Sequence, residues 1–88
     1  MKLITAIIRD SDNEAITQAL TAADFGVTCI ASTGGFLRHG QKTLLIGLED
    51  HHVQHAVQII RENCTKPSES DPRQSIIFVM NIVEQTRF

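Results

Sequence analysis

Several features that mark specialised proteins are scarce or missing in this chain of 88 residues. Its two cysteines, Cys29 and Cys64, are too few for a disulfide framework and do not form a metal-binding motif. The net charge of −2 argues against a broad basic surface for nucleic acid or acidic membranes. The chain also lacks a signal-peptide core and any apolar run of about 18 residues, the length of a membrane helix. These absences predict a reduced, cytoplasmic protein that binds neither a nucleic acid polymer nor a membrane.

Known phosphate-binding and RNA-binding motifs are missing as well. The glycine pair at residues 34–35 is not part of a Walker motif or of a GxGxxG pattern. Phe78 is the single aromatic residue of the last predicted strand and has no RNP-like pattern around it, which disfavours RNA binding.

Catalytic groups are poorly represented. Asp10 and Asp12 are better explained by helix capping than as a carboxylate pair. Cys29 is expected in the core, and Cys64 at the end of a helix, where the helix dipole does not activate a thiol. No nucleophile or acid–base pair has an orienting partner, so the protein is not expected to be an enzyme.

The bulk composition is that of a small globular protein. Apolar residues make up 42% of the chain and charged residues 20%, which are ordinary values. A chain of this length is expected to form one domain, residues 1–88, and to bury about 60–65% of its unfolded surface. Such a domain can fold alone but has little core to spare.

Residues 1–32 predict a strand, a helix and a second strand. Residues 2–9 are rich in β-branched side chains, as expected of a strand. Ser11 and Glu14 have the spacing of a capping box at a helix start. Gly26 stands where a glycine that ends the helix or opens the next strand belongs, and residues 27–32 predict that strand. The expected buried face of this helix consists of Ile16, Ala19, Leu20 and Ala23.

The rest of the chain predicts two further strands around a second helix. Residues 42–48 predict a strand with Leu44, Ile46 and Leu48 on one side. Asp50 can cap a helix that ends near Cys64. Residues 65–74 contain both prolines and predict a flexible connection, and residues 75–83 predict the last strand. The buried stripe of the second helix is expected to contain Val53, Ala56, Val57 and Ile60.

The order β-α-β-β-α-β predicts an α+β fold of the ferredoxin-like kind. In this fold two helices cover one face of a four-stranded antiparallel sheet. The second face is expected to be apolar too, and an open apolar face of that size favours closed cyclic self-association. We therefore expect a homo-oligomer with a ligand site at a subunit boundary. The residues that predict the apolar second face are Leu3, Ile7, Leu45, Ile77 and Val79.

The stretch at residues 31–38 leads into a predicted loop or short excursion over residues 33–41 and combines groups suited to a nucleotide. Ser32 and Thr33 offer hydroxyl groups, and the two glycines allow backbone N–H groups to converge on an anion. Phe36 offers a flat face for a base, and Arg38 a fixed positive charge. The alternative is a tight connection between two strands with one exposed aromatic side chain.

Two histidines raise the separate possibility of a metal site. His51 and His55 are four residues apart, a spacing that places two imidazoles on one helix face and suits Zn²⁺ or Cu²⁺. Further ligands and the glutamate of a zincin motif are missing at the required positions. A solvated helix face is therefore favoured, and no metal site is assigned.

With this loop and this order of elements, the sequence resembles the PII-like cyclic-di-AMP receptor family. Residues 32–37 are similar to the TTGGFL-type loops that are quite specific to that family. The similarity runs without a gap from residue 1 to Cys64 and resumes over the last strand. Positions in the family's pattern and spacing are Met1-Lys2-Leu3-Ile4, Ala6-Ile7, Asp10, Phe25, Thr28, Ala31, Thr33-Gly34-Gly35-Phe36-Leu37-Arg38, Gly40, Thr43, Gly47, Glu49-Asp50, Val53, Cys64, Phe78-Val79-Met80 and Phe88.

The resemblance implies a homotrimeric, non-enzymatic sensor that binds cyclic-di-AMP or a related adenine nucleotide in clefts between subunits. It implies that Phe36 and Leu37 enclose one adenine, while Thr28 and the two glycines contact phosphate and ribose. It also implies an unidentified downstream protein partner and no cofactor. The ligand-binding residues carried over by the resemblance are Thr28, Thr33, Gly34, Gly35, Phe36, Leu37, Gln41, Gly47, Phe78 and Arg87.

This sequence departs from the family pattern near the implied ligand. The usual asparagine and arginine on either side of Phe25 are replaced by Asp24 and Gly26, which removes a cation and adds a carboxylate that repels phosphate. Gln41 replaces an asparagine of the family pattern. Arg87 replaces a glutamine and adds a positive charge at that position.

The long loop between the second helix and the last strand of the family, its expected signalling surface, is shortened here to residues 65–74. Together with the substitutions near the ligand, this change leaves two alternatives open. One is an interaction trimer that has lost nucleotide binding, and the other is a metal-binding PII-like trimer that uses His51 and His55.

Overall fold

The computed structural model describes residues 1–30, 40–66 and 75–83. Within these residues the elements follow the predicted order, with one additional 3-10 helix. The strands are β1 (Lys2–Arg9), β2 (Thr28–Ile30), β3 (Gln41–Leu48) and β4 (Ile76–Asn81). The helices are α1 (Asp10–Ala22), the 3-10 helix η1 (Asp50–His52) and α2 (Val53–Asn63).

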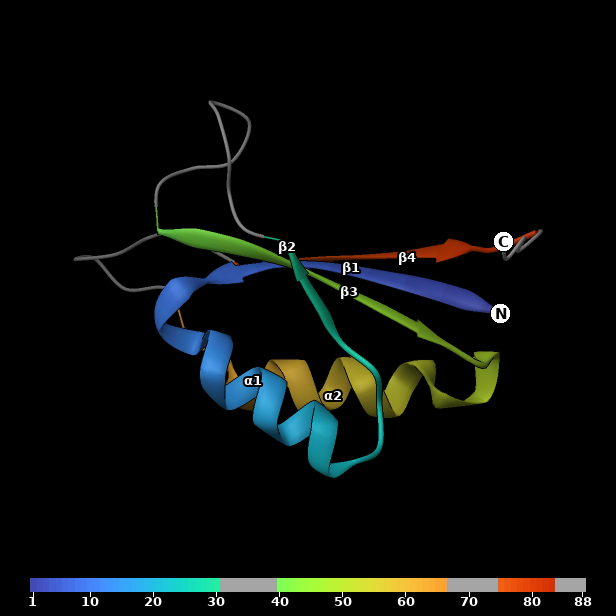
Figure 1. The fold of residues 1–88 in the computed structure, drawn as a ribbon, viewed down its shortest axis with the longest axis horizontal. Helices are drawn as coiled ribbons and strands as arrows, with labels where there is room; N and C mark the ends of the chain where they lie inside the picture. Colours follow the sequence, from blue (N-terminus) through green and yellow to red (C-terminus); the bar gives the residue numbers. More distant parts are fainter. Residues whose placement is uncertain (31–39, 67–74, 84–88) are drawn as a thin grey trace.

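The four strands form one antiparallel sheet in the order β2-β3-β1-β4. β1 pairs with β3 along its whole length, from Lys2 opposite Leu48 to Arg9 opposite Gln41, and with β4 on its other side. The two helices pack side by side against one face of the sheet (Figure 1). The predicted ferredoxin-like α+β fold is therefore confirmed.

The core lies between this helix layer and the inward-facing side chains of β1 and β3. Successive strand residues point to opposite faces, so every second residue of the two central strands faces the helices. The predicted inward side of β3 is confirmed, while Ala19, Ala23, Val53 and Val57 of the predicted helix stripes are only half-buried. The buried apolar residues are Ile4, Ala6, Ile8, Ile16, Leu20, Leu44, Ile46, Leu48, Ala56 and Ile60.

Neither α1 nor α2 begins at a side-chain cap, so both capping predictions were wrong. α1 begins at Asp10, directly after β1, with Arg9 at its N-cap and no capping hydrogen bond. The 3-10 helix η1 precedes α2 and likewise lacks a side-chain cap. None of the helices in the described ranges is long and apolar enough to cross a membrane.

Asp12 joins the beginning of α1 to the chain that leaves α2. Its Oδ2 accepts a hydrogen bond from the backbone N–H of Thr65 (2.9 Å), and its Oδ1 accepts one from the Thr65 hydroxyl (2.6 Å). Asp12 is nearly fully buried, and these bonds compensate the cost of burying its carboxylate. This long-range contact, rather than capping, is what Asp12 does in the fold.

The sheet face opposite the helices is apolar, but β4 contributes different residues from those predicted. The register places Ile76, Phe78 and Met80 beside Ile7, Thr5 and Leu3 respectively on this open face. Ile77 and Val79 instead face the helices. The error arose because the continuous apolar run of β4 gives no two-residue alternation from which its direction can be read.

The two edge strands are more exposed than the sequence suggests. All three residues of β2 are exposed, including Cys29, which had been predicted in the core. β2 pairs only with β3 among the described strands, which makes it an edge of the sheet. In β4, five of six residues are exposed.

Leu20 provides a test of the core. Its side chain is fully buried on α1, so Leu20→Ala is expected to lower the free energy of unfolding by about 2–5 kcal/mol, through lost burial and a residual cavity. Val83→Ala is the control, because Val83 is 96% exposed and its truncation should change stability by less than about 0.5 kcal/mol. Urea unfolding followed by circular dichroism measures both, and equal midpoints would contradict this packing.

Candidate functional site

Four of the ten predicted ligand-binding residues lie in the described part of the chain, and all four belong to strands. Thr28 is the first residue of β2, Gln41 the first of β3, Gly47 lies near the end of β3, and Phe78 is on β4. The remaining six predicted residues lie outside the described residues: Thr33, Gly34, Gly35, Phe36, Leu37 and Arg87.

Thr28 and Phe78 occupy one row across the open face. Thr28 is opposite Leu45, Leu45 is opposite Thr5, and Thr5 is opposite Phe78. β2 and β4 are the two edges of the sheet, so three strand spacings of ~4.8 Å separate these residues by ~14 Å. One subunit therefore does not bring Thr28 and Phe78 to the same base.

Gln41 lies at the far end of β3 from Gly47. It pairs with Arg9 in the register, and both side chains are buried. Six residues of extended chain separate Gln41 from Gly47 by ~20 Å. The N–H of Asp10 donates to the carbonyl of Gly40 (2.8 Å), which fixes the chain where β3 begins. Gln41 had been predicted in a loop and is instead a buried strand residue.

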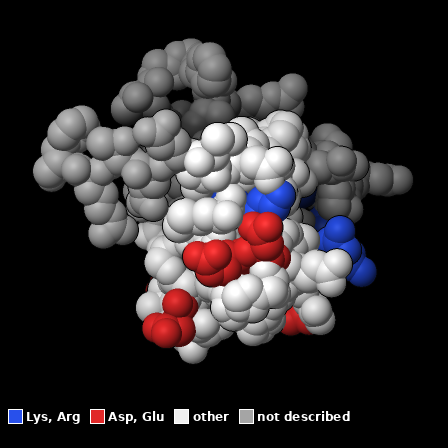
Figure 2. All heavy atoms as spheres, turned by 90° about the vertical axis from the view of Figure 1, so that its right-hand side faces the viewer, with Lys and Arg blue, Asp and Glu red and all other residues white. Residues whose placement is uncertain are grey.

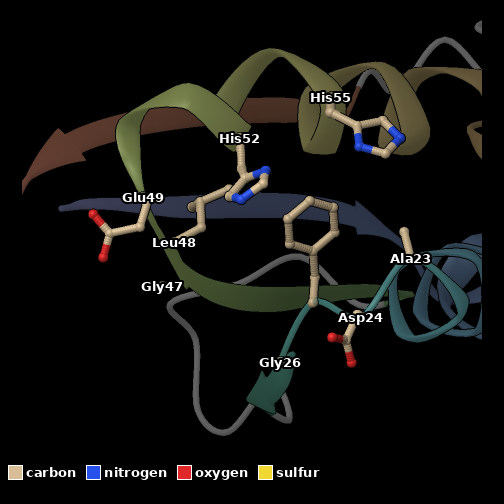
Figure 3. A pocket seen from close by; sticks show the side chains of 9 residues that line it. Ala23, Asp24, Gly26, Gly47, Leu48, Glu49, His52 and His55 are labelled. Carbon is tan, nitrogen blue, oxygen red and sulfur yellow. The ribbon is translucent and has the colours of Figure 1, made fainter.

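Gly47 lines an open pocket of about 430 Å³ at the other end of the sheet (Figure 3). The pocket lies between the turn that follows α1, the end of β3, and the helical segment formed by η1 and the start of α2. Figure 3 shows the His52 and His55 rings on the helical side, with the carboxylates of Asp24 and Glu49 at the rim. The pocket is lined by Ala23, Asp24, Phe25, Gly26, Gly47, Leu48, Glu49, His52 and His55.

The turn after α1 positions Asp24 and Phe25 in this pocket. Asp24 has a φ of 69°, the left-handed conformation that commonly ends a helix. Its N–H donates to the carbonyl of Thr21 (2.9 Å), and the N–H of Phe25 donates to that of Leu20 (3.0 Å). Of the two roles predicted for Gly26, ending the helix falls instead to Asp24, because aspartate tolerates this conformation better than most residues.

Phe25 and two histidines form the aromatic part of the pocket. The ring centroid of Phe25 lies 5.8 Å from that of His52 and 5.7 Å from that of His55, both edge-to-face. His51 instead lies against His52, with ring centroids 4.1 Å apart. The histidines that share a site are therefore His52 and His55 rather than the predicted His51 and His55. Within the described ranges, no three His, Cys, Asp or Glu residues are grouped to hold a metal ion.

The pocket is lined by two carboxylates and two imidazoles among the described residues. Asp24 and Glu49 are among its lining residues, and none of the lining residues within the described ranges is a lysine or an arginine. Figure 2 shows acidic side chains on this side of the molecule, where β1 begins and β3 ends. Nearby, the N-terminal amino group forms an ion pair with Asp50 at 3.3 Å. A phosphate at this pocket therefore meets a negative field while the imidazoles are neutral.

The comparisons with known proteins agree with this fold and show the family. The family model for the cyclic-di-AMP receptor matches residues 1–77. The chain belongs to the cyclic-di-AMP receptor family. A functionally unknown protein from Pediococcus pentosaceus is similar in structure, with a TM-score of 0.78 and 24% identity over 99% of this chain and 96% of that one. This second likeness supports the fold, whereas the first makes the protein a member of a family of nucleotide-binding signalling proteins.

The sequence did not reveal which residues share the pocket with Gly47. Phe25 and Glu49 were noted only as positions in the family pattern, and the histidines considered as a pair were His51 and His55. The available signal was the pair His52 and His55, three residues apart, a spacing that also places side chains on one helical face. Phe25 is distant from both histidines in the sequence, so nothing local predicted its contacts with them.

Asp24 allows a test of the turn that shapes the pocket. Asp24→Gly is expected to raise the free energy of unfolding by about 0.5–1 kcal/mol, because glycine adopts a positive φ without steric cost. Ala23→Gly is the matched control: Ala23 has a φ of −89°, so glycine there should lower stability by a similar amount through unfolded-state entropy. Thermal unfolding measures both, and destabilisation by Asp24→Gly would contradict the left-handed turn.

Proposed function

We propose that this receptor-family member is a non-enzymatic sensor that binds cyclic-di-AMP, or a related adenine nucleotide, in clefts between the subunits of a homotrimer. The observation that carries the proposal is the family match over residues 1–77. The arrangement of Thr28 and Phe78 at opposite edges of one sheet face supports a site completed by a second subunit.

The open face of the sheet supports self-association. Phe78, Ile76 and Met80 are 46–50% exposed in the single chain, although they are large apolar residues whose burial is favourable. Arg9 is the one charged residue that the register assigns to this face among the described strands, and it lies at one end. A ring of subunits that packs this face inward would bring the β2 edge of one subunit near the β4 edge of another.

The residue chemistry supports an adenine nucleotide as ligand. In the proposed site Phe36 and Leu37 enclose a base, and the glycine pair donates backbone N–H groups to phosphate. Thr28 contributes a hydroxyl from β2, and Phe78 an aromatic ring from β4 of the neighbouring subunit. The remaining proposed contacts come from Thr33, Gln41, Gly47 and Arg87.

We also propose that the trimer acts in the cytoplasm through a protein partner whose binding responds to the nucleotide. A competing function is an interaction trimer that has lost nucleotide sensing. Asp24 and Glu49 favour this second function, as does the lack of a lysine or arginine among the described residues that line the pocket. The two functions differ in a single measurable property, the binding of a nucleotide.

Isothermal titration calorimetry with cyclic-di-AMP tests the proposed site. Loss of base stacking in Phe36→Ala is expected to weaken binding by about 1–3 kcal/mol, or roughly fivefold to 150-fold, and Gly35→Val should abolish binding because a side chain blocks the approach of backbone to phosphate. Gln58→Ala is the control, since Gln58 is exposed on α2 and bonds only Glu62. Cyclic-di-GMP is the non-adenine comparison and is expected to give no heat. Absence of heat with cyclic-di-AMP, ATP and ADP as well would favour the interaction trimer.

Two lysine substitutions on β4 test the oligomer. Phe78 and Val79 are 50% and 46% exposed, but they lie on opposite faces of the sheet. Phe78→Lys is expected to convert a particle of about three times the 9.8 kDa chain mass into monomer, because it places a charge in the packed face. Val79→Lys should leave the trimer intact, because lysine can extend its amine to solvent. Sedimentation equilibrium decides the outcome, and a monomeric parent protein would refute the assembly.

A further inference from the structure

We propose that nucleotide binding by this protein is linked to proton uptake at His52 and His55, so that the site accepts its anionic ligand more readily as the pH falls. This inference rests on the proposed nucleotide-binding function and concerns the regulation of the same site. It arises from the side chains that surround Gly47, which belongs both to the proposed ligand site and to the pocket described above.

The two carboxylates of the pocket oppose an anionic ligand. Asp24 and Glu49 line the same pocket as Gly47, and no hydrogen bond or ion pair in the described part of the chain engages either carboxylate. Cyclic-di-AMP carries two phosphodiester groups, each with a negative charge. A phosphate held near Gly47 therefore approaches uncompensated negative charge, and this repulsion weakens binding.

The imidazoles of His52 and His55 are the groups in the pocket lining that can offset this charge. Both rings pack against Phe25, so both lie on the same wall of the pocket. Histidine is the side chain that ordinarily changes charge between pH 5 and 8. The ionisable side chains among the described lining residues are two carboxylates and two imidazoles. Their summed charge is −2 when both imidazoles are neutral and zero when both are protonated.

Other charged groups around the histidines modify this response without replacing it. On the 3-10 helix, His51 lies against His52, with ring centroids 4.1 Å apart. Asp50 is engaged by the N-terminal amino group. Lys2, which the register places opposite Leu48, donates its ammonium to the side-chain carbonyl of Asn81. Asp24 from the turn after α1 and Glu49 from the end of β3 complete the charged groups at this pocket.

The sign of the effect follows from proton linkage. A bound dianion favours the protonated form of a nearby imidazole, so the complex holds more protons than the free protein. Affinity therefore falls as the pH rises through the range in which histidine loses its proton. Uptake of one full proton on binding changes the affinity tenfold per pH unit. Partial proton uptake at the two rings, about half a proton on average, therefore changes the affinity about tenfold over two pH units.

Calorimetry with cyclic-di-AMP at pH 6 and pH 8 tests this inference on the full chain. Phosphodiesters do not titrate in this range, unlike the terminal phosphate of a mononucleotide, whose second pKa is about 6. Repeating the titration near pH 7 in two buffers of different ionisation enthalpy counts the protons taken up. The parent protein is expected to bind about tenfold more tightly at pH 6 and to take up about half a proton per ligand.

Three variants assign the effect to the pocket. His52→Gln combined with His55→Gln should bind equally at both pH values, near the affinity of the parent at pH 8, with no proton uptake. His51→Gln is the matched control: His51 is adjacent in sequence but is not a lining residue, so most of the pH dependence should remain. Asp24→Asn combined with Glu49→Gln should tighten binding at pH 8, because the repulsion is removed.

The outcomes separate this inference from the proposed function. Nucleotide binding with equal affinity at pH 6 and pH 8, or a pH dependence that survives in the double histidine variant, would overturn the proton linkage and leave the sensor function standing. Absence of binding at both pH values would overturn both proposals. Circular dichroism of each variant at both pH values confirms that it is folded before its binding is compared.

Discussion

The pairing of β1 with β3 is the interaction on which the rest of the structure depends. These strands are the two central ones of the sheet and remain in register over eight residues each. Their strict alternation directs Ile4 and Ile46 into the core while their neighbours form the open face. A slip of one residue would exchange the two faces, which would expose the core and remove the surface on which the proposed assembly rests.

The ends of β3 divide the proposed site into two distinct environments. Gln41 at its beginning is buried opposite Arg9, whereas Gly47 near its end borders an open, acidic pocket with two imidazoles. An elongated ligand would therefore meet a different environment at each end of the strand, with negative charge near Gly47. The receptor family match and this asymmetry together make the charge of the pocket the main determinant of affinity in our proposals.

Much of the fold was predictable because β1, β3 and both helices carry clear local periodicity. Inward positions such as Leu44 followed directly from alternation, and the confirmed element order followed from turn and breaker residues. β4 could not be oriented, because its continuous apolar run fits either face, and Cys29 looked like a core residue because edge position is not encoded locally. For the candidate site, a family pattern identified Gly47, but the grouping of Phe25 with His52 depends on tertiary packing. The part of the prediction at residues 31–39 lies outside the described residues.

The bonds between Asp12 and Thr65 have a consequence for how this fold tolerates change in length. Because Thr65 is fixed to the beginning of α1, the chain that follows starts from the same point whatever its length. Loop-closure entropy grows slowly, by only about 0.6 kcal/mol for each doubling of a flexible loop. Insertions and deletions between Lys66 and Ser75 are thus thermodynamically cheap, so this segment can diverge among relatives while the sheet and helices stay the same.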